Sequence, residues 1–258
     1  MPREDRSQFV LYYQPQVDMN QRLIGAECLI RWDHPDGRTV GPADLIPLAE
    51  ETRLIVSIGQ WVCEQLAQWA KLPQLAALTL SVNVSVHQFH NENFVAQVED
   101  ALGRSGANPS RLKLELTESL LVSDVDAVVA KMLALKQRGI RLSLDDFGTG
   151  YSSLNYLKRL PLDQLKIDRT FVQDLPGNGD DMAIVKSIIS LAENLGLSIM
   201  AEGIERQDQH AFLGDLGCAS FQGYLFGKPA TIHTFEERAN RMITSHAEQA
   251  VQTGGVAR

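Results

Sequence analysis

Carboxylate and amide side chains interrupt or close short apolar segments at several places along this chain. Glu27 lies within one such segment, and Asn83, Glu115 and the pair Asp145-Asp146 close three others. A carboxylate in apolar surroundings is costly unless it is paired with a cation. Several directed to one place would repel one another, and hard oxygen ligands select Mg²⁺, Mn²⁺ or Ca²⁺. Two adjacent aspartates can serve two metals, as in sites that clamp the attacking and leaving oxygens of a phosphodiester.

Two further residues are suited to activating a water molecule. Lys166 lies between Leu165 and Ile167 in an apolar segment. A lysine there either balances nearby carboxylates or orients a nucleophilic water and stabilises developing negative charge. Glu202, in a later segment, is a candidate general base for that water.

A glycine-containing loop follows the aspartate pair and begins Phe147-Gly148-Thr149-Gly150. Two glycines in three residues give the backbone unusual freedom. The loop is either a plain strand-to-helix turn or a mobile segment whose conformation depends on metals and substrate. Each acidic residue taken alone is more often a helix cap or a salt-bridge partner, and only the group of them indicates a metal site.

The elements that must position these residues alternate between strand and helix patterns. We predict strands at about 9–17, 23–32, 78–85, 111–117, 140–145, 163–168, 197–202 and 219–223. The link at 18–21 is too short for a parallel crossover, so the first strand should be antiparallel to the second. The rest reads as βα repeats. The expected fold class is α/β, a modified TIM-type (β/α)8 barrel with the first strand antiparallel, and such barrels carry catalytic residues at the carboxyl ends of their strands.

Helical spacing of apolar residues covers 54–70, 125–138 and 180–195, and Gly139 and Gly196 follow the last two as stop signals. No Pro- or Gly-rich linker divides the chain, so we predict one barrel domain over residues 1–247. Residues 248–258 are polar and contain glycine, and we expect them to form a disordered tail.

The composition excludes some classes of protein. Of 258 residues, 44% are hydrophobic and 22% charged, which permits a packed core. The net charge of −8 argues against binding long nucleic acids. The cysteines, Cys28, Cys63 and Cys218, show no metal-ligand spacing and are expected to be reduced in a cytoplasmic protein. No apolar run has the length of a membrane span, so we expect no membrane contact by this segment.

The assembled motifs resemble the EAL family of cyclic-di-GMP phosphodiesterases, from about Phe9 to about Phe235. The motif that gives the family its name reads Glu27-Cys28-Leu29 here. Further matches are Tyr13-Gln14-Pro15, Asn83-Val84-Ser85, Glu115-Leu116-Thr117-Glu118, Asp145-Asp146-Phe147-Gly148-Thr149-Gly150, Lys166-Ile167-Asp168, Ala201-Glu202-Gly203 and Gln222-Gly223-Tyr224. The visible departure is Cys28, which replaces an alanine. Strand alternation points Cys28 away from the side of Glu27, so the metal ligand should be unaffected.

The resemblance implies a role for each matching residue. Glu27, Asn83, Glu115 and Asp145 would bind a first ion, and Asp145 with Asp146 a second. Lys166 and Glu202 would position and activate the water, with Glu27 counted among the catalytic residues as well. Glu118 would hold the loop of Asp146, Phe147, Gly148, Thr149 and Gly150 in its active shape. Gln14, Arg31 and Gln222 would contact the substrate.

The implied reaction is hydrolysis of cyclic di-GMP to linear pGpG with Mg²⁺ or Mn²⁺, two ions in all, and Ca²⁺ is expected to inhibit. The alternative is a catalytically silent receptor module that binds cyclic di-GMP. No expected ligand is missing, which favours the enzyme. The family also implies homodimers, and neighbouring sensory or GGDEF (diguanylate cyclase) domains in a longer chain that can be anchored to a membrane.

Overall fold

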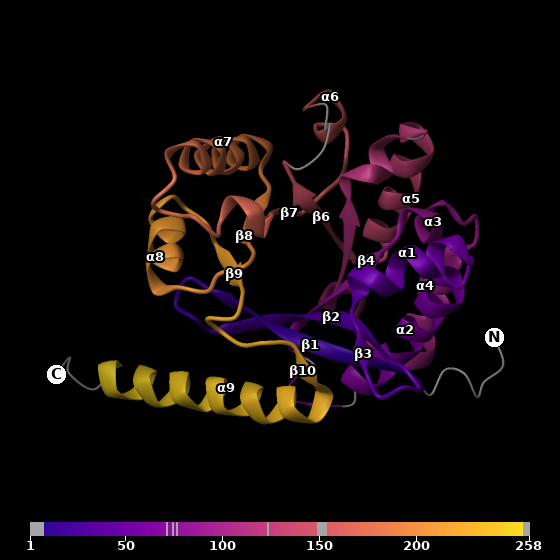
Figure 1. The fold of residues 1–258 in the computed structure, drawn as a ribbon, viewed down its shortest axis with the longest axis horizontal. Helices are drawn as coiled ribbons and strands as arrows, with labels where there is room; N and C mark the ends of the chain where they lie inside the picture. Colours follow the sequence, from indigo (N-terminus) through magenta and orange to yellow (C-terminus); the bar gives the residue numbers. More distant parts are fainter. Residues whose placement is uncertain are drawn as a thin grey trace.

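The computed structural model describes residues 8–254, except 71, 74, 76, 123 and 149–153. Eight strands close into a barrel, and helices form a ring around it (Figure 1). In order around the barrel they are β1 (Phe9–Asp18), β2 (Leu23–Asp33), β4 (Thr79–Val84), β5 (Leu112–Thr117), β6 (Arg141–Phe147), β7 (Gln164–Ile167), β8 (Ser198–Ala201) and β9 (Ser220–Gln222).

The first strand has the predicted direction. β1 is antiparallel to both of its barrel neighbours, β2 and β9, whereas the other neighbouring pairs in the barrel are parallel. A tight turn joins β1 to β2. In it, the Asp18 carboxylate accepts hydrogen bonds from the backbone N–H groups of Asn20 and Arg22, each at 2.8 Å. The predicted fold class is therefore confirmed.

Two short strands were not predicted. β3 (Thr39–Val40) pairs with β2, and β10 (Ala230–Thr231) pairs with β1. Two residues are too few to show a period of two, so the sequence pattern has nothing to reveal there.

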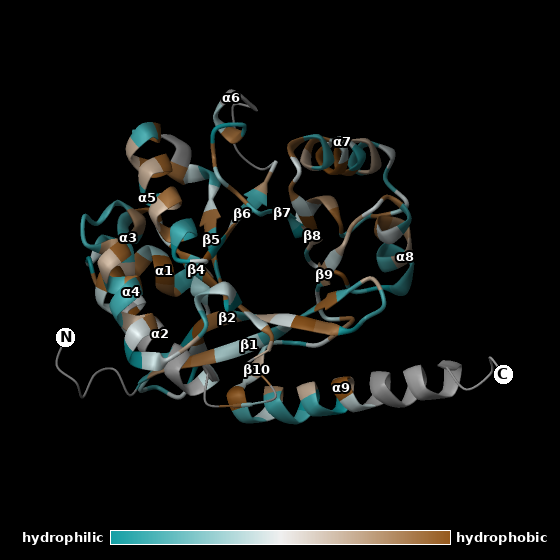
Figure 2. Ribbon diagram, turned by 180° about the vertical axis from the view of Figure 1, so that it is seen from behind, coloured by the Kyte–Doolittle hydropathy of each residue, from teal (hydrophilic) through white to brown (hydrophobic). Residues whose placement is uncertain are grey.

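The helices cover the outside of the barrel, and Figure 2 shows that they mix hydrophilic and hydrophobic residues, as helices with one face on a core do. They are α1 (Pro42–Glu51), α2 (Ile55–Ala70), α3 (Val86–His90), α4 (Phe94–Ser105), α5 (Val125–Gln137), α6 (Leu154–Leu157), α7 (Gly179–Leu195), α8 (Gln207–Asp215) and α9 (Ile232–Gly254). Short 3-10 turns flank two of the strands: η2 (Pro109–Arg111) precedes β5, η3 (Glu118–Val122) follows it, and η4 (Arg169–Phe171) follows β7. The predicted helices correspond to α2, α5 and α7.

The last helix extends beyond the boundary that we predicted for the domain. We expected a disordered tail from residue 248, but the backbone remains helical to Gly254, and residues 255–258 lie outside the described part. The residues just after 247 include Glu, Gln and Ala, which favour helix, so polarity alone was a poor indicator of the end. The first turns of α9 lie under the barrel (Figure 1). There Phe235 packs against Tyr13 of β1 and Trp69 of α2, with ring centroids 6.0 and 5.6 Å away.

Alternation along each strand separates the core from the site. In β5, Leu112, Leu114 and Leu116 face the surrounding helices, whereas Lys113 and Glu115 face the barrel interior, and all five are buried. The hydrophobic core therefore lies between strands and helices. The barrel interior is left for polar side chains that converge on one mouth.

Candidate active site

Three carboxylates, carried by β5, by β6 and by the residue after β8, meet around one ammonium group. Lys166 of β7 is fully buried, and its Nζ donates to Glu115 Oε2 at 2.5 Å. The same Nζ lies 3.0 Å from Asp145 Oδ1 and 2.5 Å from Glu202 Oε1. Glu115 belongs to β5 and Asp145 to β6, and Glu202 directly follows β8. Lys166 thus offsets the charge of the residues predicted as ligands and base.

Amide side chains hold Glu27 on the opposite side of the mouth. Asn83 of β4 donates from Nδ2 to Glu27 Oε1 at 2.5 Å. Gln222, the last residue of β9, donates from Nε2 to Glu27 Oε2 and, at 3.2 Å, to Gln14 Oε1. Gln14 in turn donates to the Gly227 carbonyl at 3.2 Å. Both carboxylate oxygens of Glu27 are therefore fixed in direction.

Asp145 and Asp146 both reach the mouth because the end of β6 is irregular. Adjacent residues of a regular strand point to opposite faces, which would turn Asp146 away from the site. The register between β6 and β7 shifts between Leu144 and Phe147, and Asp146 has a left-handed backbone with φ 54°. Aspartate tolerates this conformation better than most residues. Carboxylate oxygens of Asp145, Asp146 and Glu202 consequently lie within 4.8 Å of one another.

The start of the glycine loop is attached to the η3 turn. Glu118 Oε1 accepts a hydrogen bond from the backbone N–H of Gly148 at 2.9 Å. Phe147 is buried, and Gly148 has a left-handed φ of 98°. Thr149 and Gly150, which we also assigned to the loop, lie outside the described residues.

A second buried lysine was not singled out from the sequence. Lys113 of β5 donates to Gln164 Oε1 at 2.7 Å, and its Nζ lies 3.8 Å from Glu115 Oε1. Glu115 therefore has an ammonium group on each side, one from Lys166 and one from Lys113. The signal was present, because Lys113 stands two residues before Glu115 in an apolar strand and so faces the same side.

Burial and charge shift the pKa values of these carboxyl groups in different directions. Burial raises the pKa of Glu27, Asp145 and Glu202, although Lys166 opposes the shift. Burial and the neighbouring Asp145 raise the pKa of Asp146 to about 6. The pKa of Glu115 is lowered despite its burial, because both lysines favour its ionised form. The carboxylates of the mouth outnumber its ammonium groups, which is an environment that attracts cations.

The donor set fits divalent metal ions. One group of possible ligands consists of Glu27, Glu115 and Asp145, and another of Asp145, Asp146 and Glu202, with ligand oxygens within 4.8 Å of one another in each group. Asp145 is common to both groups, as a residue that bridges two ions would be. Every donor is a hard oxygen, which suits Mg²⁺ or Mn²⁺ rather than a soft metal.

Arg31 lies at the rim and not in the carboxylate cluster. It is four residues beyond Glu27 on β2, and its guanidinium carbon is 5.5 Å from the centre of the Tyr12 ring. Its Nη1 donates to the Ile30 carbonyl at 2.9 Å. Of the residues predicted for substrate contact, Gln14 and Gln222 touch the cluster and Arg31 stands beside it.

The fold and the cluster define a class, the β/α-barrel proteins with an acidic mouth whose oxygen donors suit divalent cations. The chain belongs to the EAL domain family, whose model matches residues 3–229. The resemblance that we inferred from the motifs is thereby confirmed.

Similar proteins support this assignment. The chain is 46% identical over 230 residues to MucR of Pseudomonas aeruginosa, a bifunctional diguanylate cyclase/cyclic di-GMP phosphodiesterase, covering 87% of this chain and 33% of MucR. It is 36% identical over 236 residues to the signaling protein YkoW of Bacillus subtilis, covering 90% of this chain and 30% of YkoW. The chain thus spans about a third of the length of these curated relatives.

Solved structures share the same fold. The MucR phosphodiesterase in complex with c-di-GMP has a TM-score of 0.84 and 45% identity, covering 90% of this chain and 96% of that one. The manganese/cyclic di-GMP complex of BlrP1 from Klebsiella pneumoniae has a TM-score of 0.74 and 29% identity, covering 89% of this chain and 57% of that one.

Among the residues that the structure describes, no helix is long and apolar enough to span a bilayer.

Proposed function

We propose that this chain hydrolyses cyclic di-GMP to linear pGpG with two divalent cations, Mg²⁺ or Mn²⁺. The observation that carries the proposal is two clusters of carboxylates that share Asp145, one of which includes Glu202. The Lys166 ammonium group contacts both Asp145 and Glu202. The substrate follows from the family and from the c-di-GMP complex of the MucR phosphodiesterase, which is 45% identical.

The family resemblance suggests a role for each of the chain's own residues, and the distances between them are compatible with these roles. Glu27, Asn83, Glu115 and Asp145 would hold one ion, and Asp145 with Asp146 the other. The ions, when bound, would supply Lewis acidity toward the phosphodiester. Glu202 would accept a proton from the water that attacks phosphorus, and the raised pKa of Glu202 suits a proton acceptor. As the bond from phosphorus to O3′ breaks, the departing O3′ would take a proton from solvent water and become the 3′-hydroxyl of pGpG. Lys166 keeps Glu202 and Asp145 in place, while Gln14, Gln222 and Arg31 would contact the nucleotide.

The direct test is to incubate the purified chain with cyclic di-GMP and Mg²⁺ and to measure products by chromatography. We expect linear pGpG, its loss when EDTA removes the metal, and its return with Mg²⁺ or Mn²⁺ but not with Ca²⁺. Tight binding of cyclic di-GMP without product would overturn the proposal and leave the silent receptor module as the function.

We also make a proposal about the domains and the partner subunit with which this chain works. The curated relatives are about three times as long as the matched region, so we propose that this chain works beside sensory or GGDEF domains. From the family resemblance we also propose that it pairs as a homodimer. We also propose that the catalytic barrel acts in the cytoplasm. Mass measurement of the chain in solution tests the dimer, because a monomeric mass at assay concentration would contradict it.

A further inference from the structure

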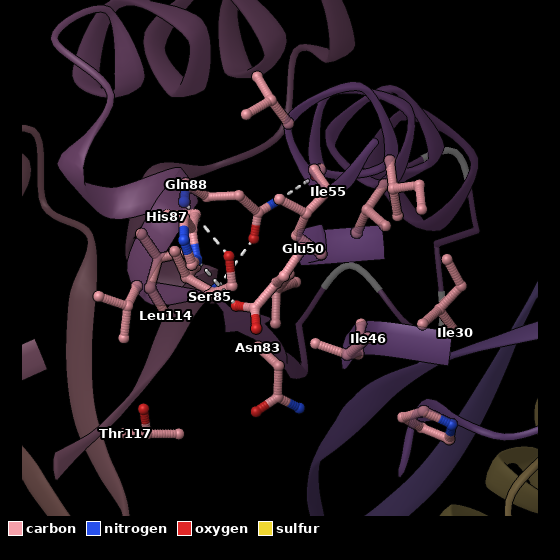
Figure 3. A pocket seen from close by; sticks show the side chains of 18 of the residues that line it. Ile30, Ile46, Glu50, Ile55, Asn83, Ser85, His87, Gln88, Leu114 and Thr117 are labelled. Carbon is pink, nitrogen blue, oxygen red and sulfur yellow. Dashed lines mark hydrogen bonds and ion pairs between the residues drawn. The ribbon is translucent and has the colours of Figure 1, made fainter. Parts of the chain in front are cut away.

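A cavity of about 710 Å³ lies beside the mouth, between the barrel wall and helices α1 to α4. Figure 3 shows Glu50 and Asn83 at its centre, with Ile30 and Ile46 on one side and Leu114 and Thr117 on the other. Its inner end reaches Glu27, Asn83 and Asp145. The remainder, which we call the side chamber, is lined mainly by aliphatic and aromatic side chains, among them Ile46, Ile58, Val62, Val84 and Phe94.

The side chamber lies behind the strands that carry the proposed ligands. Glu27 and Asn83 face the barrel interior, so Cys28 and Val84, next to them in sequence, face the helices. Both Cys28 and Val84 line the cavity. The chamber therefore occupies the layer between strands and helices, which is normally filled by packed side chains. The cavity as a whole, with its inner end included, has a volume within the range of small-molecule pockets.

Charge restricts what the side chamber can hold. Among the described residues that line the cavity, none is a lysine or an arginine, whereas Glu27, Glu50 and Asp145 are carboxylates. Glu50 Oε1 lies 3.4 Å from His87 Nδ1, and about 29% of its side chain is exposed. In the side chamber itself, an anion would face the Glu50 carboxylate and no lysine or arginine among the described lining residues. An uncharged apolar molecule with an N–H or O–H group would bury its body and donate to Glu50.

We propose that the side chamber is a binding site for a small uncharged apolar molecule with one hydrogen-bond donor, separate from the site of the phosphodiester. Its wall includes Val84 and Ser85, which directly follow Asn83; Val84 ends β4 and Ser85 is the N-cap of α3. Ser85 caps α3, accepting from Gln88 N at 3.2 Å, and Gln88 donates to the Ile55 carbonyl of α2 at 2.9 Å. A bound molecule would contact this connected segment without touching Asn83 itself.

The first experiment measures binding of N-phenyl-1-naphthylamine, an uncharged apolar amine whose fluorescence rises in apolar surroundings. We expect saturable binding of one molecule per chain. Val62→Phe fills part of the chamber and should weaken binding about tenfold or more, whereas Val129→Phe on α5, which does not line the cavity, should leave it unchanged. Equal affinity of the two variants, each with a parent-like melting temperature, would overturn the proposal.

The second experiment uses the chain's own thiols. Cys28 lines the cavity, and Cys218 is buried elsewhere. N-phenyl-1-naphthylamine should slow the reaction of Cys28 with N-ethylmaleimide, followed by peptide mass spectrometry, and should not change the rate at Cys218. Saturating cyclic di-GMP with Ca²⁺ should neither displace the probe nor protect Cys28. If it does both, the chamber is a part of the nucleotide site and the proposed separate site does not exist.

Discussion

Lys166 is the side chain on which the charge balance of the mouth depends. It is fully buried and contacts Glu115, Asp145 and Glu202. Those carboxylates raise the pKa of its ammonium group well above the ordinary value, so the lysine stays charged despite burial. A cation that is held in this way cannot serve as a proton acceptor. We therefore assign proton acceptance to Glu202 and orientation to Lys166.

Removal of Glu27 should abolish turnover. Glu27→Ala deletes a proposed metal ligand and leaves the amides of Asn83 and Gln222 without their shared acceptor. We expect a loss of at least about 100-fold in kcat at saturating Mg²⁺. Glu27→Gln keeps the shape, loses the charge and should be similarly inactive. A rate near that of the parent in either variant would show that the metal site is misplaced.

Glu118 should affect turnover through one carboxylate oxygen, the Oε1 that accepts the hydrogen bond from Gly148. Glu118→Ala removes the acceptor of the Gly148 N–H, and the loss of such a bond corresponds to about a tenfold decrease in kcat. Glu118→Gln retains an acceptor oxygen and should stay close to the parent. Steady-state rates and Mg²⁺ dependence of both variants check this expectation. It fails if the glutamine variant is as slow as the alanine variant.

At the scale of the elements, replacement of glycine by alanine should have opposite effects on stability at two positions, Gly223 and Gly103. Gly223 follows β9, and a β-carbon there would overlap with the backbone N and O of Ile204. Those atoms bond to the Gln222 carbonyl and the Leu225 N–H at 3.1 and 3.0 Å. Gly223→Ala should therefore lower the free energy of unfolding by about 2–3 kcal/mol and displace Gln222 from Glu27.

Gly103 is the matched control for that substitution. It is an exposed residue of α4, and a β-carbon there would meet no atom within 4 Å. Gly103→Ala should raise the free energy of unfolding by about 0.5–1 kcal/mol, because alanine favours helix. Urea unfolding of both variants measures the difference. Equal effects at the two positions would contradict the close approach at Gly223.

The sequence was sufficient for the strands but not for every side-chain direction. Short β-rich runs placed the eight barrel strands within about one or two residues, because period and length are local properties. The orientation of the Asp146 side chain could not be predicted from such local patterns, because it depends on a register shift against β7 and on a left-handed φ. The hydrogen-bond partner of Lys113 could not be predicted either, because Gln164 lies 51 residues away along the chain.

At the scale of the whole molecule, the acidic mouth should make stability without metal depend on pH. The folded pKa of Asp146, about 6, is above its ordinary value of 3.8, so the folded state binds a proton more tightly than the unfolded state. The contribution of Asp146 to the free energy of unfolding is complete below pH 3.8 and is lost as the pH rises through about 6. The raised pKa values of Glu27, Asp145 and Glu202 act in the same direction.

In EDTA, the melting temperature should therefore fall as pH rises from about 5 to about 7, across the titration of Asp146. Mg²⁺ at neutral pH should restore it, because bound cations replace the protons as counter-charges. Asp146→Asn should flatten the dependence, and differential scanning fluorimetry provides the measurement. A melting temperature in EDTA that rises over this range would contradict the expected sign.

The antiparallel strand β1 has a consequence for the order in which the protein is made. Its edge toward β9 closes through pairs such as Gln16 and Gln222, which are 206 residues apart. A ribosome that adds about 5–20 residues per second needs about 10–40 s to cover that distance. During this time the β1–β2 hairpin has left the ribosome with one edge unpaired, and unpaired edges can join other chains. The nascent protein is therefore most vulnerable to aggregation at its first strand until its last barrel strand emerges.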